Sequence, residues 1–186
     1  MHKTINSYRI ESNRLKSVDY AFPNWFFVTI CTENHKSFFG NIKSGNMNYS
    51  SIGEIVKEEW WLTNVVRKNV DLDEFVIMPN HIHGIVIINS GGKSDFVGSG
   101  LPKMTQRVIS TDTHVTLKAN SLGAIIGQFK SVCTKRIHSL YHNDFKWQPN
   151  YYEHIIRGQK DLERIRNYIL QNPSKWEKDK FYMNTI

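Results

Sequence analysis

The pattern of apolar and polar positions predicts strands that alternate with amphipathic helices. Apolar and β-branched residues dominate 24–32 and 74–88, and runs of this composition and length are typical of strands. Apolar residues recur at helical spacing over 51–68, 121–140 and 159–172, which predicts three helices with one apolar face each. The chain therefore has the elements of a mixed helix and sheet protein.

The order of these elements predicts an α+β fold. Strand, helix, strand pair, helix and helix follow one another, and 151–157 is either a short strand or an irregular segment. Helices grouped on one face of an antiparallel sheet form such a fold, and this order suits a ferredoxin-like sandwich. We expect one domain over 1–186. Residues 89–120 show no lasting periodicity and predict a mobile loop, either a phosphate-contacting segment or a solvated insertion.

Charge points to an anionic partner. Lys and Arg total 24 against 17 Asp and Glu, which gives a net charge of +7 and a pI near 9.4. Nucleic acid is the leading candidate, with membrane surfaces and acidic proteins as alternatives. No apolar run approaches the roughly 18 residues of a membrane span, and the first residues lack the apolar core of a signal peptide. We expect a cytoplasmic protein in which Cys31 and Cys133 are reduced.

Two histidines stand two residues apart in the motif MPNHIHG, Met78–Gly84. In extended backbone, residues i and i+2 project from the same face, so His81 and His83 lie side by side. They are either structural histidines with satisfied ring nitrogens or half of a metal site. Two rings held this close inside an apolar run favour the metal site.

The last predicted helix carries Tyr168 and Asn172, four residues apart and about 40° apart around the helix axis. Alone, they are more simply a boundary aromatic and a helix-end residue. Together with His81 and His83 the interpretation changes, because an amide oxygen would complete a set of two nitrogens and one oxygen. Such a mixed set suits Mg²⁺ or Mn²⁺. A closed structural zinc site would instead need four protein ligands, commonly thiolates.

Most of the chain resembles the HUH single-tyrosine transposases of the IS200/IS605 type, and more closely their relatives associated with repetitive extragenic palindromes (REPs). The segments that carry the resemblance are YAFPNWFFVTICT, SSIGEIVKEEWW, FVIMPNHIHGIVII, SLGAIIGQFKSVCTKRI, WQPNYYEHIIR and RIRNYILQNP. The most specific feature is MPNHIHG followed far downstream by a tyrosine and an asparagine one turn apart. The resemblance implies the HUH endonuclease fold.

The resemblance also implies roles for the residues singled out above. His81 and His83 would bind a divalent metal, Mg²⁺ or Mn²⁺, with Asn172 as third ligand and Tyr168 as nucleophile. Many transposases of this type have Gln at the last position, so the adjacent Gln171 is an alternative third ligand. In some of them the tyrosine helix serves the histidines of a partner subunit, so a homodimer is one alternative.

The implied activity is nicking and rejoining of single-stranded DNA beside a hairpin, through a 5′-phosphotyrosine, as in DNA transposition. Backbone contacts to DNA would come from basic residues that can equally be plain surface charge. These are Lys130, Lys135, Arg136, Arg157, Arg164 and Arg166. Two other functions stay open: hairpin or single-stranded DNA binding without cleavage, and a metal-dependent phosphodiesterase that uses an activated water.

Overall fold

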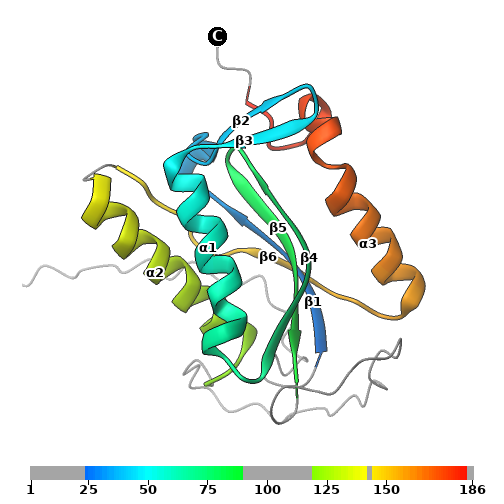
Figure 1. Cartoon of the computed structure of the whole chain (residues 1–186). Helices are drawn as coiled ribbons and strands as arrows, with labels where there is room; N and C mark the ends of the chain where they lie inside the picture. The colour runs from blue at the N-terminus through cyan, green and yellow to red at the C-terminus, as the bar shows by residue number, and fades with distance from the viewer. Residues whose placement is uncertain (1–23, 90–118, 142–143, 184–186) are drawn as a thin grey trace, which may run out of the picture.

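The computed structural model describes residues 24–89, 119–141 and 144–183 (Figure 1). The mobile loop expected at 89–120 lies almost entirely outside these residues and stays a prediction. In chain order the elements are β1 (Asn24–Cys31), a 3-10 turn (Glu33–His35), β2 (Gly40–Lys43), β3 (Asn46–Tyr49), α1 (Ser51–Val66), β4 (Val70–Met78), β5 (His81–Ile88), α2 (Leu122–Tyr141), β6 (Tyr152–Ile155), α3 (Gln159–Gln171) and a second 3-10 segment (Pro173–Lys178).

Four strands form one antiparallel sheet in the order β4-β5-β1-β6, while β2 and β3 form a separate hairpin. The segment 151–157, left open by the sequence, contains the edge strand β6, which pairs with β1. Without the hairpin, the order is strand, helix, strand, strand, helix, strand, as in a ferredoxin-like domain. The predicted α+β fold with an antiparallel sheet is confirmed.

The helices cover both faces of the sheet, because successive residues of a strand point to opposite sides. Ile82 and Val86 of β5 join a large core with α1 and α2, whereas Ile85 joins a smaller cluster with Leu162 and Ile165 of α3. Figure 1 shows α1 and α2 on one side of the sheet and α3 on the other. The expectation of all helices on one face is therefore wrong for α3, whose apolar stripe packs on the face that α1 and α2 leave uncovered.

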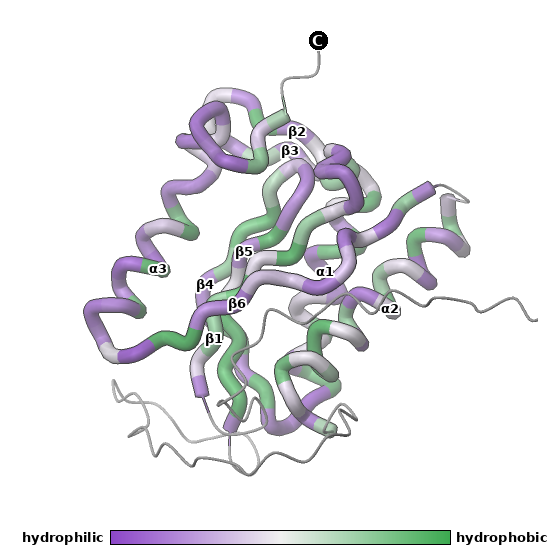
Figure 2. Tube along the Cα trace, turned by 180° about the vertical axis from the view of Figure 1, so that it is seen from behind, coloured by the Kyte–Doolittle hydropathy of each residue, from purple (hydrophilic) through white to green (hydrophobic). Residues whose placement is uncertain are grey.

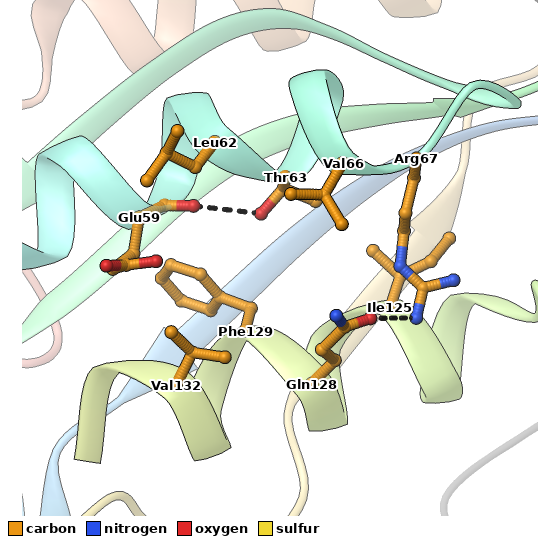
Figure 3. Close-up of a pocket in the computed structure, with 9 residues that line it drawn as sticks. All are labelled: Glu59, Leu62, Thr63, Val66, Arg67, Ile125, Gln128, Phe129 and Val132. Atoms are coloured by element: carbon orange, nitrogen blue, oxygen red, sulfur yellow. Dashed lines mark hydrogen bonds between the residues drawn. The ribbon is translucent and has the colours of Figure 1, made fainter. Parts of the chain in front are cut away.

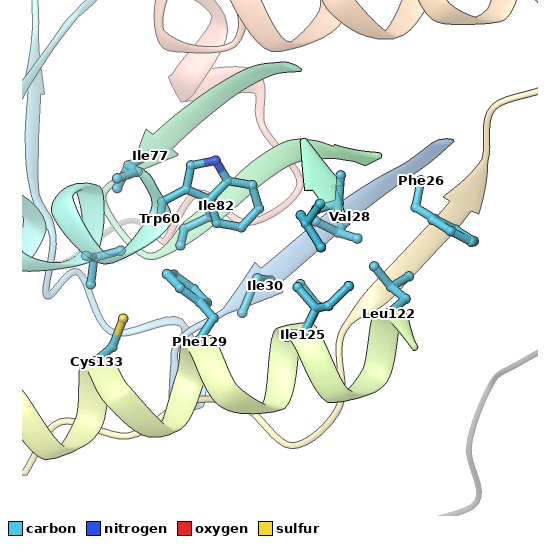
Figure 4. Close-up of a cluster of buried hydrophobic side chains, with 14 of the residues drawn as sticks. Phe26, Val28, Ile30, Trp60, Ile77, Ile82, Leu122, Ile125, Phe129 and Cys133 are labelled. Carbon is cyan, nitrogen blue, oxygen red and sulfur yellow. The ribbon is translucent and has the colours of Figure 1, made fainter. Parts of the chain in front are cut away.

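The larger core lies between the sheet and the layer of α1 and α2 (Figure 4). Phe26 and Ile30 of β1 meet Trp60 of α1 there, and all three are at most 1% exposed. Figure 2 shows hydrophobic residues along the central strands, while α3 is largely hydrophilic. Cys31 and Cys133 are buried free thiols, as predicted.

Helix boundaries agree with the sequence pattern to within two residues. Ser50 caps α1, because its hydroxyl accepts a hydrogen bond from the N–H of Gly53 at 3.0 Å. The helix ends at Val66 rather than Lys68, and α3 ends at Gln171, one residue before the predicted end. Among the described helices, none combines the length and apolar content needed to cross a membrane.

The glycine of the histidine motif has a packing role. A β-carbon on Gly84 would lie 2.4 Å from Cζ2 of Trp60 and 3.3 Å from Cβ of Phe75. The buried indole has little room to withdraw, because protein cores are close-packed. Gly84 thus lets α1 approach the strand that carries the two histidines.

Replacing Gly84 by alanine is expected to lower the free energy of unfolding by about 1–3 kcal/mol, because the new methyl group overpacks the core. Urea denaturation measures the change. Gly127→Ala is the matched control, since its β-carbon would meet no atom within 4 Å on exposed α2 surface, and it should stabilise the helix by up to about 1 kcal/mol. Equal stability of the two variants would contradict this packing role.

Candidate active site

His81 and His83 face each other at the start of β5. Their Nε2 atoms lie 3.1 Å apart, and the side chains are 0% and 1% exposed. Aromatic rings surround them: Phe27 stacks on His83 at 5.4 Å between centroids, and Phe181 lies 4.7 Å from His81. The structure brings the two imidazoles together, as the strand spacing predicts.

Asn80 fixes the orientation of the His81 ring. Its Nδ2 donates to the carbonyl oxygens of His35 and Phe181 at 2.9 and 2.8 Å, which leaves Oδ1 as an acceptor. This Oδ1 lies 2.8 Å from Nδ1 of His81, so the hydrogen bonds assign the ring proton to Nδ1. The lone pair of a neutral His81 is then on Nε2, which faces His83.

Thr29 of β1 supports His83 in a similar way. Its Oγ1 lies 2.8 Å from Nδ1 of His83, and the two residues are direct partners in the β1–β5 register. If Nε2 of His83 binds a cation, Nδ1 carries the proton and donates to this hydroxyl. Both imidazoles therefore have the outer partners that metal-binding histidines require.

Burial keeps both imidazoles neutral. It lowers the pKa of His83 to about 3, and it also lowers the pKa of His81 well below its usual value, with repulsion from His83 as the second cause. The neutral ring is the form that binds metal. Near neutral pH, neither ring has to lose its proton to solvent before a cation binds, and His83 has only to carry its single proton on Nδ1.

The metal-free protein is expected to lose stability in acid. The unfolded chain protonates His83 near pH 6.5, whereas the folded protein keeps it neutral to about pH 3. The unfolded state thus binds more protons in this window, and the free energy of unfolding falls by up to about 1.4 kcal/mol per pH unit for this group. Urea denaturation with chelator at about pH 7 and about pH 5 should show a smaller decline for His83→Gln than for the wild type. Equal declines would contradict the assignment.

Tyr168 reaches the histidine pair from α3. Its hydroxyl oxygen lies 3.1 Å from Nε2 of His83, and the two ring centroids are 5.1 Å apart in an edge contact. The side chain is 41% exposed, since it lies at the border of the apolar stripe that packs on the sheet. The tyrosine and the histidines meet within one chain.

The surroundings of Tyr168 favour the protonated phenol. Burial raises its pKa, and the negative charge of Asp179 raises it further, while a hydrogen bond with Asn172 lowers it. Without added positive charge, the hydroxyl is a weak nucleophile near neutral pH. A cation bound at the histidine pair would favour the phenolate.

Asn172 is better placed than Gln171 to supply an oxygen. It is 4% exposed, and its Oδ1 is buried without a hydrogen-bond partner among the described residues. Gln171 is exposed, and its Oε1 accepts a hydrogen bond from Lys175 at 2.6 Å. A buried acceptor without a partner is costly unless a donor or cation meets it, which favours Asn172 as a ligand.

Asp179 is a second oxygen source, which the sequence did not single out. One ligand atom from each of His81, His83 and Asp179 lies within 4.8 Å of the others. Asp179 follows the 3-10 segment after α3, where no periodic pattern marks it. Only the return of the chain toward β5 brings this carboxylate to the histidines.

The residues present fit a divalent cation. Two nitrogens in adjacent octahedral positions at about 2.1 Å from a metal would stand about 3 Å apart, and the two Nε2 atoms are 3.1 Å apart. Two neutral nitrogens combined with amide and carboxylate oxygens can hold a divalent metal ion. The donor set thus agrees with a divalent metal, and its identity as Mg²⁺ or Mn²⁺ stays a prediction.

Two of the predicted DNA-contacting cations join separate elements through carboxylate partners. Arg166 donates from Nε to Asp73 at 2.7 Å, which ties α3 to β4, and Arg136 donates to Glu59 at 2.9 Å between α2 and α1. Backbone phosphates would have to compete with these pairs. Both side chains therefore have a structural role that the sequence pattern did not reveal.

The other four predicted contacts differ in their surroundings. Arg164 pairs with Asp161 at 2.6 Å, and Lys130 donates to the carbonyl oxygen of Gln148 at 2.7 Å. Burial lowers the pKa of Lys130 to about 8, as expected for a lysine held inside the fold. Lys135 and Arg157 are exposed and stay predicted DNA contacts.

A groove between α1 and α2 lies on the opposite side of the sheet from the histidine pair (Figure 3). Leu62, Phe129 and Val132 line it, and Arg67 closes one end with a hydrogen bond to Gln128. Its lining residues include no histidine or tyrosine. This groove therefore offers none of the groups that form the histidine site.

Comparison with solved structures identifies the fold. The structure of the REP-associated tyrosine transposase bound to a REP hairpin superposes with a TM-score of 0.53 and 18% identity, over 92% of this chain and 77% of that one. The chain therefore has the fold of a single-tyrosine transposase, as the resemblance implied. No family model matches the chain.

Comparison of sequences identifies the family. An uncharacterized protein of Haemophilus influenzae is 35% identical over 173 residues, which cover 93% of both proteins. The chain belongs to the family of this protein.

Proposed function

We propose that this protein nicks and rejoins single-stranded DNA by transesterification, with Tyr168 as the nucleophile, and that it acts as a transposase. The observation that carries the proposal is the meeting of Tyr168 with the histidine pair, 3.1 Å from Nε2 of His83 within one chain. A tyrosine beside two neutral imidazoles and a buried amide oxygen without a partner is difficult to explain by stability alone.

The proposed cation is Mg²⁺ or Mn²⁺, held by His81, His83 and Asn172, with the carboxylate of Asp179 as a further oxygen. When bound, it would act as a Lewis acid that stabilises negative charge on the phosphate and on the tyrosine oxygen. Asn80 holds the His81 ring with Nε2 free, and the hydroxyl of Thr29 can accept the Nδ1 proton of His83 when Nε2 of that ring binds the cation. The aromatic rings around the pair keep this region low in water.

Tyr168 would carry the covalent step. Its hydroxyl oxygen attacks phosphorus, the bond to the 3′ oxygen breaks, and a 5′-phosphotyrosine forms. The phenolic proton passes to solvent, which the partial exposure of the side chain allows, and the 3′ oxygen takes up a proton. Since the phosphotyrosine keeps the ester, a 3′-hydroxyl of another strand can reverse the attack and join.

Single-stranded DNA beside a hairpin is the proposed substrate. The REP-associated transposase of the same fold is bound to a REP hairpin. The net charge of +7 is consistent with a nucleic-acid partner. An unpaired strand also exposes its phosphates to a tyrosine that lies against a sheet.

Covalent capture tests the proposal without knowledge of the target. The protein is incubated with Mn²⁺ and labelled DNA that carries a fixed hairpin between randomised single strands, then resolved on a denaturing gel. We expect a protein–DNA adduct whose DNA converges on one sequence and whose linked peptide contains Tyr168. Cleaved DNA without adduct would indicate hydrolysis by water, and binding without cleavage would indicate a DNA-binding protein; either result would overturn the proposal.

A further inference from the structure

The edge strand β6 carries an exposed aromatic side chain close to the histidine pair. Tyr152 is the β-sheet partner of Thr29, and Thr29 is in turn the partner of His83. Directly paired residues share a face of the sheet, so Tyr152 lies on the same face as His83. Neighbouring strands are about 4.8 Å apart, which places Tyr152 about 10 Å from His83 along this row.

The ring of Tyr152 is accessible on this face, since the residue is 47% exposed. Phe181 lies beside the ring at 6.4 Å between centroids, and nearly half of the residue still stays open to solvent. The next side chain of β6 on the same face, His154, is bound to Asp161 at 2.7 Å. Tyr152 is therefore the aromatic group of this strand that a ligand can cover.

A cation accompanies this ring. Nζ of Lys180 lies 5.5 Å from the ring centroid of Tyr152 and 4.6 Å from that of Phe181. Lys180 is exposed, and its charge contributes to the lowered pKa values of His81 and His83, so it lies on their side of the sheet. An ammonium group and an open aromatic ring thus lie together beside the proposed cleavage site.

We infer that Tyr152 and Lys180 form a nucleotide subsite, in which an unpaired base next to the scissile phosphate stacks on Tyr152 and a neighbouring phosphate contacts Lys180. Every base offers a flat face, so stacking on aromatic side chains holds single strands without a sequence requirement. The inference rests on the proposed function, because it places the DNA strand across the histidine pair from α3 toward β6. Tyr152 would position the strand and take no part in the chemistry.

Binding without metal tests the subsite separately from catalysis. The probe is a labelled oligothymidylate of about 20 nucleotides with one central 2-aminopurine, whose fluorescence is quenched by stacking. In a Tyr168→Phe background with chelator, Tyr152→Ala should raise the Kd about tenfold and relieve the quenching, because base stacking on an aromatic residue contributes on this scale. Tyr152→Phe should preserve both signals, and Lys180→Ala should weaken binding and reduce its salt dependence.

Tyr141→Ala is the matched control, because this tyrosine is 45% exposed at the end of α2. It should bind the probe as the parent does. Absence of binding by the parent, or equal quenching in the parent and in Tyr152→Ala, would overturn the subsite. If the subsite is correct and the proposed function is wrong, the protein still quenches the probe through Tyr152 but forms no covalent adduct with Mn²⁺.

Discussion

Replacing Tyr168 by phenylalanine is expected to abolish the protein–DNA adduct, with a loss of at least about a thousandfold, because the attacking oxygen is removed. The ring itself stays, so its edge contacts with His83 and Phe27, at 5.1 and 6.0 Å between centroids, are preserved. Binding of the captured hairpin should therefore change by less than about twofold, since only one hydroxyl is lost and the ring stays in place. Denaturing gels measure the adduct, and fluorescence anisotropy measures binding.

Tyr141→Phe is the control for this prediction, since it removes a hydroxyl of similar exposure from α2. It should form adduct at the wild-type rate. Persistence of the adduct in Tyr168→Phe would show that another side chain is the nucleophile, and the role assigned to the α3 tyrosine would then be wrong.

Removing one imidazole is expected to abolish cation binding. His83→Ala should weaken Mn²⁺ binding by more than about a hundredfold. The substitution removes one of the two imidazole nitrogens, which are the strongest ligands of the proposed site. Electron paramagnetic resonance of free Mn²⁺ measures the affinity directly and does not depend on activity. Wild-type affinity in His83→Ala would contradict the proposed site.

The same measurement separates direct ligands from supporting groups. Asn80→Ala should weaken Mn²⁺ binding about 10- to 100-fold, because His81 loses the acceptor that fixes its tautomer. Asn172→Ala should weaken it through loss of a ligand oxygen. Asp179→Asn keeps an oxygen and removes the charge, so a loss in Asp179→Ala that Asp179→Asn recovers would assign Asp179 as a ligand. An unchanged affinity in Asn172→Ala would exclude that residue from the site.

Local patterns predicted most of the fold. Strand runs and helical periodicity located β1, β5 and all three described helices, because burial on one face leaves a regular mark in the sequence. The strand β6 was left open, since it has only four residues and its outer edge has no partner strand within the described parts of the chain. Helical periodicity shows that α3 has an apolar face. It does not show on which face of the sheet that apolar side packs.

Sequence spacing could predict the residues of the candidate site that lie close together along the chain. It could not predict residues that only the tertiary fold brings to the histidines. His81 and His83 follow from a period of two, whereas Tyr168 and Asn172 gain a role only in combination with the histidines and through the family resemblance. Asp179 and Lys180 reach the histidines through a turn after α3 that has no periodic signal. The carboxylate partners of Arg136 and Arg166 lie 77 and 93 residues away along the chain, so a basic residue could not be distinguished from a structural ion pair.

Tyr168 and the two histidines depend on different parts of the interior. α3 is held by the small cluster that contains Leu162, Ile165 and Ile169, whereas β5 is anchored in the large core. Elements with fewer buried contacts open more readily than the core of the same protein. Substitutions in the small cluster can thus change how often Tyr168 meets the histidine pair while the sheet stays folded, so the geometry of the candidate site can vary without loss of the protein.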